Sequence, residues 1–171
     1  MIISVIGYMG SGKSHISKSL SKKINFKFFD LDNEIISIHK MKITEIFATR
    51  GEIYFRKEEN KILKEILNTK EDIILSLGGG TPVYYNNIDL INEWSESIFL
   101  QASVPTLTDR LLKQKSKRPL IANIKDEDLP EFIAKHLFER NPYYSKAKHI
   151  INTDKKNPET IVQEIIDTLG I

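Results

Sequence analysis

Residues 7–14 of the chain read Gly7-Tyr8-Met9-Gly10-Ser11-Gly12-Lys13-Ser14. They follow an apolar run, Ile2 to Ile6, and precede a stretch of helical character, Ser14 to Lys23. The pattern G-x-x-x-x-G-K-[ST] in this setting is typical of a phosphate-binding loop. Its glycines let successive backbone N–H groups turn toward phosphate oxygens, and the helix N-terminus adds a favourable dipole. An ordinary glycine-rich turn is the alternative, and the flanking strand and helix make it the weaker one.

The loop predicts particular ligands for a nucleotide. Lys13 is expected to reach the β- and γ-phosphates of ATP, and the Ser14 hydroxyl to coordinate Mg²⁺. Asp30 closes the strand expected at Phe26–Phe29 and would supply a carboxylate to the same ion at the carboxyl edge of the sheet. Asp32 could face a second substrate. Either aspartate could instead cap the helix that follows, and the sequence leaves that alternative open.

Outward from the loop, short apolar or β-branched runs alternate with helix-length stretches of mixed charge, which is typical of βαβ units. Helices are expected at Ser14–Lys23, near Glu52–Leu67 and from Pro158 onward. Five strands are expected, at Ile2–Ile6, Phe26–Phe29, Ile73–Leu77, Ser97–Leu100 and His149–Ile151. The sequence thus predicts an α/β fold, a three-layer sandwich around a five-stranded parallel sheet, with residues 1–171 as one domain.

Two stretches interrupt this rhythm. Residues 30–51 insert short helices between the second and third strands, and residues 114–128 are polar and rich in lysine. Long irregular segments in a compact domain are commonly functional. Both are therefore candidates for functional segments, and residues 114–128 are expected to form a mobile loop rather than core.

Composition excludes several classes of function. The chain has 171 residues, a net charge of +2 and no cysteine, so disulfides, thiolate metal sites and a cysteine nucleophile are excluded. No apolar stretch approaches the roughly 20 residues that span a bilayer, and the N-terminal run lacks the basic region of a secretory signal. Mixed charges give no single-sign field, so neither nucleic acid nor a membrane is expected as a partner. The four histidines show no ligand spacing, and a cytoplasmic protein is expected.

Several further blocks occur in a fixed order after the loop, and together they identify a resemblance. The blocks are Asp30-Leu31-Asp32, Phe47-Ala48-Thr49-Arg50-Gly51-Glu52, Phe55-Arg56, Leu77-Gly78-Gly79-Gly80, Arg118-Pro119-Leu120 and Arg140-Asn141-Pro142-Tyr143-Tyr144. With residues 7–14 they resemble the shikimate kinase family, small P-loop kinases related to the nucleoside monophosphate kinases. The ordered set is far more specific than any one block.

The resemblance implies a fold and a reaction. It implies a P-loop kinase fold with a substrate-binding insertion at about 31–60 and a lid at about 113–126. The implied reaction transfers the γ-phosphoryl group of ATP, with Mg²⁺, to the 3-hydroxyl of shikimate in aromatic amino acid biosynthesis. The implied catalytic residues are Lys13, Asp32 and Arg118. The protein is expected to act as a monomer.

The resemblance also assigns residues to each ligand. The nucleotide residues would be Gly10, Ser11, Gly12, Lys13, Ser14, His15, Arg110, Arg118 and Pro158, and the metal residues Ser14 and Asp30. The shikimate residues would be Asp32, Phe47, Phe55, Arg56, Gly78, Gly79, Gly80 and Arg140. From the residues alone, the three glycines could form a plain turn, the two phenylalanines could be core, and Arg110 could be a solvated helix residue.

Two other functions stay open at this point. A related kinase could phosphorylate gluconate or a nucleoside monophosphate, although Arg56 beside Phe55 and the triple glycine suit a small carboxylated polyol better. A nucleotide-binding regulatory module without catalysis is the alternative from another class. Such a module would not need Asp32 or the other groups on the acceptor side.

Overall fold

The structure, a computed structural model, describes residues 1–171. Its centre is one sheet of five parallel strands in the order β2-β3-β1-β4-β5. The strands are β1 (Ile2–Ile6), β2 (Lys27–Asp30), β3 (Ile73–Ser76), β4 (Glu96–Gln101) and β5 (His149–Asn152). The predicted parallel sheet is confirmed, and each strand end differs from its predicted position by no more than one residue.

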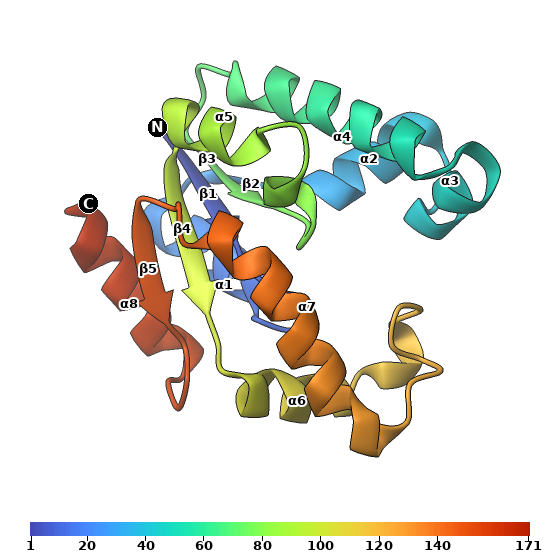
Figure 1. Ribbon diagram of the computed structural model, residues 1–171. Helices are drawn as coiled ribbons and strands as arrows, with labels where there is room; N and C mark the ends of the chain where they lie inside the picture. The colour runs from blue at the N-terminus through green and yellow to red at the C-terminus, as the bar shows by residue number, and fades with distance from the viewer.

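Helices cover both faces of this sheet (Figure 1). They are α1 (Lys13–Ile24), α2 (Leu31–His39), α3 (Ile43–Arg50), α4 (Glu52–Leu67), α5 (Asn87–Trp94), α6 (Val104–Leu112), α7 (Leu129–Tyr144) and α8 (Pro158–Leu169). Short 3₁₀ turns occur at Thr81–Val83, Lys115–Lys117 and Asp126–Asp128. The predicted α4 and the start of α8 at Pro158 agree with the structure, and α1 begins one residue before its predicted start.

The two faces of the sheet carry separate cores. Ile3 and Val5 of β1 point to one side, where they pack with α1 and α8 in a cluster of 11 buried residues. Ile2 and Ile6 point to the other side and belong to a cluster of 25 that extends through α4, α5, α6 and α7. Alternate residues of a strand face opposite sides, so a continuous apolar run can serve both layers of a buried parallel sheet.

The two irregular segments lie at the same end of the molecule (Figure 1). Helices α2 and α3 pack against the first part of α4, with Ile35 and Ile46 fully buried between them. Residues 113–128 form the connection from α6 to α7 and contain only turns and two short 3₁₀ helices. None of the helices combines the length and the apolar character needed to cross a membrane.

Candidate active site

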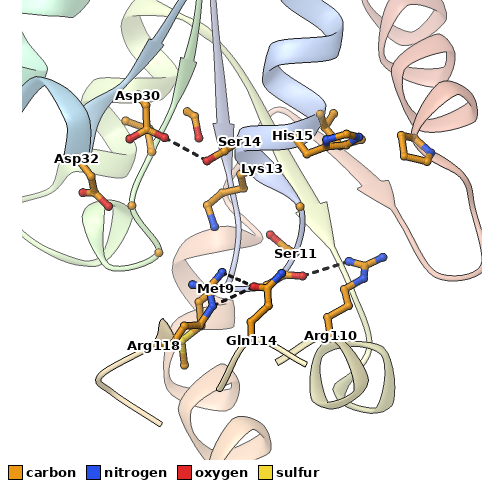
Figure 2. A pocket seen from close by; sticks show the side chains of 18 of the residues that line it. Met9, Ser11, Lys13, Ser14, His15, Asp30, Asp32, Arg110, Gln114 and Arg118 are labelled. Carbon is orange, nitrogen blue, oxygen red and sulfur yellow. Dashed lines mark hydrogen bonds between the residues drawn. The ribbon is translucent and has the colours of Figure 1, made fainter. Parts of the chain in front are cut away.

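A cavity of about 650 Å³ opens at the carboxyl ends of β1, β2 and β3 (Figure 2). Ligands of parallel α/β sheets bind at this edge. Its wall combines residues from the phosphate-binding loop, from the ends of β2 and β3, and from the segment after α6. The lining includes Met9, Gly10, Ser11, Gly12, Lys13, Ser14, His15, Asp30, Asp32, Gly78, Gly79, Arg110, Lys113, Gln114, Arg118, Lys156 and Pro158.

The phosphate-binding loop turns directly into α1. Gly12 has a φ of +93°, a conformation that residues with a side chain rarely adopt, and Lys13 is the first residue of the helix. Ser11, Gly12 and Lys13 are thus at the helix N-terminus, where unpaired N–H groups and the helix dipole favour an anion. This is the geometry that the sequence pattern predicted.

Lys13 extends into the cavity between Asp32 and Arg118 (Figure 2). Its Nζ donates a hydrogen bond to the backbone oxygen of Tyr8 at 2.8 Å. Burial lowers the pKa of Lys13 from 10.5 to about 8, although the nearby Asp32 carboxylate acts in the opposite direction. An anionic ligand in the cavity would favour the charged ammonium, so this lysine is suited to bind phosphate oxygens.

Asp30 has two roles at the end of β2. Its Oδ2 accepts a hydrogen bond from Ser14 Oγ at 3.1 Å, and its Oδ1 accepts one from the backbone N of Asn33 at 3.2 Å. The capping alternative is thus realised by Asp30, which is the N-cap of α2, while Asp32 lies inside the helix and caps nothing.

Ser14 and Asp30 form a donor pair suited to Mg²⁺, because both offer hard oxygen ligands and lie within hydrogen-bond distance of each other. No group of three or more His, Asp or Glu side chains gathers around them. A magnesium ion here would therefore take its other ligands from nucleotide phosphates and water, as Mg²⁺ commonly does in phosphoryl-transfer sites.

Asp32 faces the loop that follows β3. A Cβ placed on Gly78 would lie 3.2 Å from Asp32 Oδ1, a tight contact that the glycine avoids. Burial raises the pKa of Asp32 from 3.8 to about 6, and the charges of Asp30 and Glu59 act in the same direction. The carboxyl group is ionised at neutral pH and is more basic than an exposed aspartate.

The same glycine loop receives two arginines from different helices. A Cβ on Gly80 would lie 2.6 Å from Arg56 Nη2, and a Cβ on Gly79 would lie 3.1 Å from Arg140 Nη1. Arg56 comes from α4 and Arg140 from α7. Two guanidinium groups and the Asp32 carboxylate thus converge on three consecutive glycines, although Gly80 and both arginines lie beyond the lining of the main cavity.

Arg56 is held by a buried polar network. Its Nη1 donates to Glu59 Oε1 at 2.8 Å, and Glu59 Oε2 accepts a hydrogen bond from Thr81 Oγ1 at 2.9 Å. Glu59 is 1% exposed, and the centroid of the Tyr84 ring lies 4.1 Å from the guanidinium carbon of Arg56.

Sequence reasoning missed Glu59, Thr81 and Tyr84. A signal for Glu59 was available, because an acid three residues after Arg56 lies on the same face of α4.

Phe47 and Phe55 stack on each other with ring centroids 4.6 Å apart. Phe55 is buried in the core, and Phe47 packs against it with partial exposure. The Arg56 guanidinium lies 5.1 Å from the Phe55 ring and 5.9 Å from Phe47. The pair therefore packs beside Arg56 and lies outside the lining of the main cavity.

The nucleotide side of the cavity is basic. Arg110 donates to the backbone oxygen of Gly10 at 3.3 Å, so it contacts the phosphate-binding loop. Arg118 donates from Nε and Nη2 to Gln114 Oε1 at 3.3 and 2.9 Å (Figure 2). His15 and Pro158 line the same cavity. Sequence reasoning missed Lys113, Gln114 and Lys156, which look like ordinary polar residues without a local motif.

This fold and this site define the class of protein: a P-loop kinase with a basic phosphate site next to a carboxylate and a pair of arginines. The sequence matches the profile of the shikimate kinase family over residues 9–170. The chain belongs to this family. Among its relatives, the shikimate kinase of Flavobacterium psychrophilum is 49% identical and covers 95% of each chain. That of Flavobacterium johnsoniae is 48% identical and covers 98% of each.

Solved structures agree with this assignment. The crystal structure of shikimate kinase from Bacteroides thetaiotaomicron superposes with a TM-score of 0.93 at 33% identity, and covers 100% of this chain and 99% of the other. Shikimate kinase from Acinetobacter baumannii in complex with shikimate gives a TM-score of 0.87 at 26% identity, covering 98% and 92%. A deoxyadenosine kinase from M. mycoides, at 20% identity and a TM-score of 0.61, shares the fold. The predicted fold and family are thus confirmed.

Proposed function

We propose that this chain transfers the γ-phosphoryl group of ATP to the 3-hydroxyl of shikimate, giving shikimate 3-phosphate and ADP on the route to aromatic amino acids. The observation that carries the proposal is the convergence of Asp32, Arg56 and Arg140 on Gly78–Gly80, beside the phosphate-binding loop. A small polyol that bears a carboxylate matches these groups. Membership of the shikimate kinase family supports the same substrate.

The donor half of the reaction needs charge neutralisation, because negative charge is spread over the phosphoryl oxygens in the transition state. Lys13 and the N–H groups at the start of α1 would bind the β- and γ-phosphates. Ser14 and Asp30 would hold Mg²⁺, which neutralises phosphate oxygens when it is bound. Arg118 would add a guanidinium once it leaves Gln114 and turns toward the transferred group.

The acceptor half needs orientation and a proton acceptor. Arg56 and Arg140 would bind the carboxylate of shikimate, since a planar guanidinium can donate two parallel hydrogen bonds to it. Asp32 would accept the proton of the 3-hydroxyl while the hydroxyl oxygen attacks the γ-phosphorus and the bond to the bridging oxygen of ADP breaks. A pKa of about 6 leaves Asp32 ionised at neutral pH and close to the optimum for this transfer.

Residues about 31–60 would serve as the substrate-binding insertion and residues about 113–126 as the lid. Support comes from their position on the same side of the molecule (Figure 1). Asp32 of the first segment and Lys113, Gln114 and Arg118 of the second also line the cavity. Closure of a lid excludes water, which otherwise competes as the phosphoryl acceptor. Every group named above comes from one chain, so the site needs no residue of a second copy, and a monomer is the form that we propose.

A coupled assay of ADP release tests the proposal. Purified protein with Mg²⁺ and ATP is offered shikimate, gluconate or AMP in separate reactions. We expect turnover with shikimate alone, and omission of Mg²⁺ should abolish it. Turnover with gluconate or AMP in the absence of shikimate turnover would assign the chain to another kinase. No turnover with any acceptor, together with ATP binding, would favour a regulatory module.

A further inference from the structure

Tyr8, in the middle of the phosphate-binding loop, joins two parts of the site. It is 1% exposed. Its backbone oxygen accepts the hydrogen bond from Lys13 Nζ, and its side-chain Oη lies 2.9 Å from His136 Nδ1 on α7. The two rings meet edge to face, with centroids 5.3 Å apart. One residue therefore contacts both the phosphate-binding lysine and the helix that carries Arg140.

Helix α7 presents His136, Arg140 and Tyr144 at intervals of four residues, so the three side chains lie on one face. Tyr144 Oη donates to the backbone oxygen of Gly79 at 2.6 Å. The Arg140 guanidinium carbon lies 6.0 Å from the centroid of the Tyr8 ring. The helix is thus attached to the phosphate-binding loop on one side of Arg140 and to the glycine loop on the other.

Arg140 depends on these attachments for its position. Arg56 is fixed by ion pairs with Glu52 and Glu59, whereas Arg140 has no carboxylate within 4.0 Å. Its guanidinium is placed by the helix backbone, by the Tyr8 ring beside it and by the side chain of Tyr144 one turn further along α7. A small shift of α7 would move the guanidinium directly, and bidentate binding of a carboxylate tolerates little displacement.

We propose that Tyr8 and His136 are positioning residues whose hydrogen bond holds α7 against the phosphate-binding loop and thereby sets where Arg140 meets the acceptor carboxylate. This inference rests on the proposed function. It adds a specific consequence: binding of the acceptor depends on a tyrosine that belongs to the donor-side loop.

The experiment removes the hydrogen bond from each side. Tyr8→Phe and His136→Phe keep aromatic rings in contact with each other, and the ring introduced by His136→Phe would retain the packing on Phe132, whose centroid lies 5.5 Å from that of His136. Because Arg140 would bind the carboxylate equally in the ground and transition states, its displacement raises KM without lowering kcat. We expect a rise of about three- to tenfold in the KM for shikimate in each variant, with kcat and the KM for ATP within about twofold.

Two further variants separate positioning from general stability. The double variant Tyr8→Phe, His136→Phe should be no worse than the more affected single variant, because both changes break the same bond. His136→Asn keeps an acceptor near the position of Nδ1 for the Tyr8 hydroxyl and should recover most of the affinity for shikimate. Tyr143→Phe is the matched control, because Tyr143 lies on the same helix, is partly exposed and makes no bond to the glycine loop such as the one made by Tyr144.

The outcomes are distinct. A variant that is merely less stable would lower kcat through loss of active enzyme and leave the KM for shikimate unchanged, which would overturn the inference. An equal rise in the KM for ATP and for shikimate would also overturn it, since Tyr8 would then act on the phosphate-binding loop alone. If the wild-type protein phosphorylates shikimate and the variants match it, only this inference fails. If the wild type does not phosphorylate shikimate, the proposed function fails as well.

Discussion

Asp32 illustrates how a single residue can oppose stability for the sake of function. The cavity wall removes water from its carboxyl group, and two other carboxylates lie close enough to raise its pKa further. Lys13 and Arg56 offset only part of this effect. An ionised carboxylate in such a place destabilises the folded chain, yet it is the basic group that a hydroxyl acceptor needs.

Asp32→Asn should therefore stabilise the protein and inactivate it. Raising the pKa from 3.8 to about 6 corresponds to about 3 kcal/mol against the ionised form. The wild type should lose this stability as pH rises from about 4 to about 6 and remain less stable above, because the unfolded state releases the proton first. Urea unfolding should show Asp32→Asn to be more stable at pH 8 by up to about 3 kcal/mol, with the difference vanishing near pH 4.

Activity and a control complete this test. The kcat of Asp32→Asn should fall by a factor of at least about 100. Asp109→Asn, a change at an exposed position of α6, should alter neither kcat nor the pH dependence of unfolding. Equal stability of wild type and Asp32→Asn at pH 8 would show that the carboxyl group is not destabilised by its surroundings.

Arg56 and Arg50 offer a matched pair of arginines six residues apart. Arg56 faces the glycine loop, whereas Arg50 is exposed at the end of α3. Since an ammonium cannot reproduce bidentate binding, Arg56→Lys should raise the KM for shikimate at least about tenfold, or about 1.4 kcal/mol, and leave the KM for ATP unchanged. Arg50→Lys should leave both constants unchanged in the same steady-state assay. A normal KM for shikimate in Arg56→Lys would rule out Arg56 as a carboxylate ligand.

Site residues could be predicted from the sequence where a motif requires a particular residue type at a particular position. Lys13 and Ser14 follow a glycine pattern that leaves little freedom, and they line the cavity as expected. Tyr8 occupies a variable position of the same pattern, so nothing local indicated its bond to His136, 128 residues away. The role of Asp30 as both cap and Ser14 partner needed geometry, because both functions favour the same residue type.

At the scale of elements, the loop after β3 can accept Asp32, Arg56 and Arg140 at short distance because its three glycines have no side chains. Gly80 has a φ of −87°, which any residue can adopt, so its constraint is steric: a Cβ would lie 2.6 Å from Arg56. Gly170 shows the opposite combination, with a φ of +67° and no atom within 4 Å of its Cβ position. Substitutions at these two glycines therefore distinguish the effect of a steric contact, at Gly80, from the effect of backbone strain, at Gly170.

Gly80→Ala should therefore displace Arg56 and raise the KM for shikimate by about tenfold or more, and it should also lower the stability, because the buried Glu59 would lose contact with its partner. Gly170→Ala should lower the free energy of unfolding by about 1 kcal/mol, through the strained φ, and leave both KM values unchanged. Steady-state kinetics and urea unfolding of both variants provide the measurements. If Gly80→Ala bound shikimate normally, Arg56 would have to move freely, contrary to its buried ion pair with Glu59.

Elements with regular patterns were also predictable, and the others were not. Helix α4 has an apolar stripe at Ile62, Leu63 and Leu67, and both of its ends were predicted correctly. Helix α7 contains Pro142, a residue that usually interrupts a helix, and its weakly patterned sequence places the partly buried His136 and Arg140 among apolar neighbours. Its orientation depends on contacts with Tyr8 and Gly79, which are distant in sequence, so no local signal could reveal where Arg140 points.

At the scale of the whole molecule, the strand order brings the two halves of the site together. The central strand β1 leads into the phosphate-binding loop and Lys13, while its neighbour β3 leads into the glycine loop. On the far side of β3, β2 ends at Asp30, two residues before Asp32. Because parallel strands bring these groups to one edge of the sheet, the strand pattern of the sequence was enough to predict the fold class and the position of the site. The distances between helices could not be predicted from that pattern.

This convergence predicts a bell-shaped pH dependence of activity. Asp32 must be ionised to accept a proton, so kcat/KM for ATP at low shikimate should rise with pH through about 6. Lys13 must be charged to bind phosphates, so the same quantity should fall as pH rises through about 8. Bound ATP places negative charge beside Lys13 and raises the pKa of this lysine. At saturating ATP, kcat should therefore still rise with pH through about 6, whereas its fall near pH 8 should move to a higher pH.

Lys13→Arg provides the control for this pH dependence. A guanidinium stays charged throughout the range, so the alkaline limb of kcat/KM should disappear in this variant even if its overall activity is lower. An alkaline limb near pH 8 that persists in Lys13→Arg would assign that limb to another group. A limb that does not move between kcat/KM and kcat would mean that Lys13 does not contact the bound phosphates, because a lysine paired with phosphate cannot keep the pKa of the free enzyme.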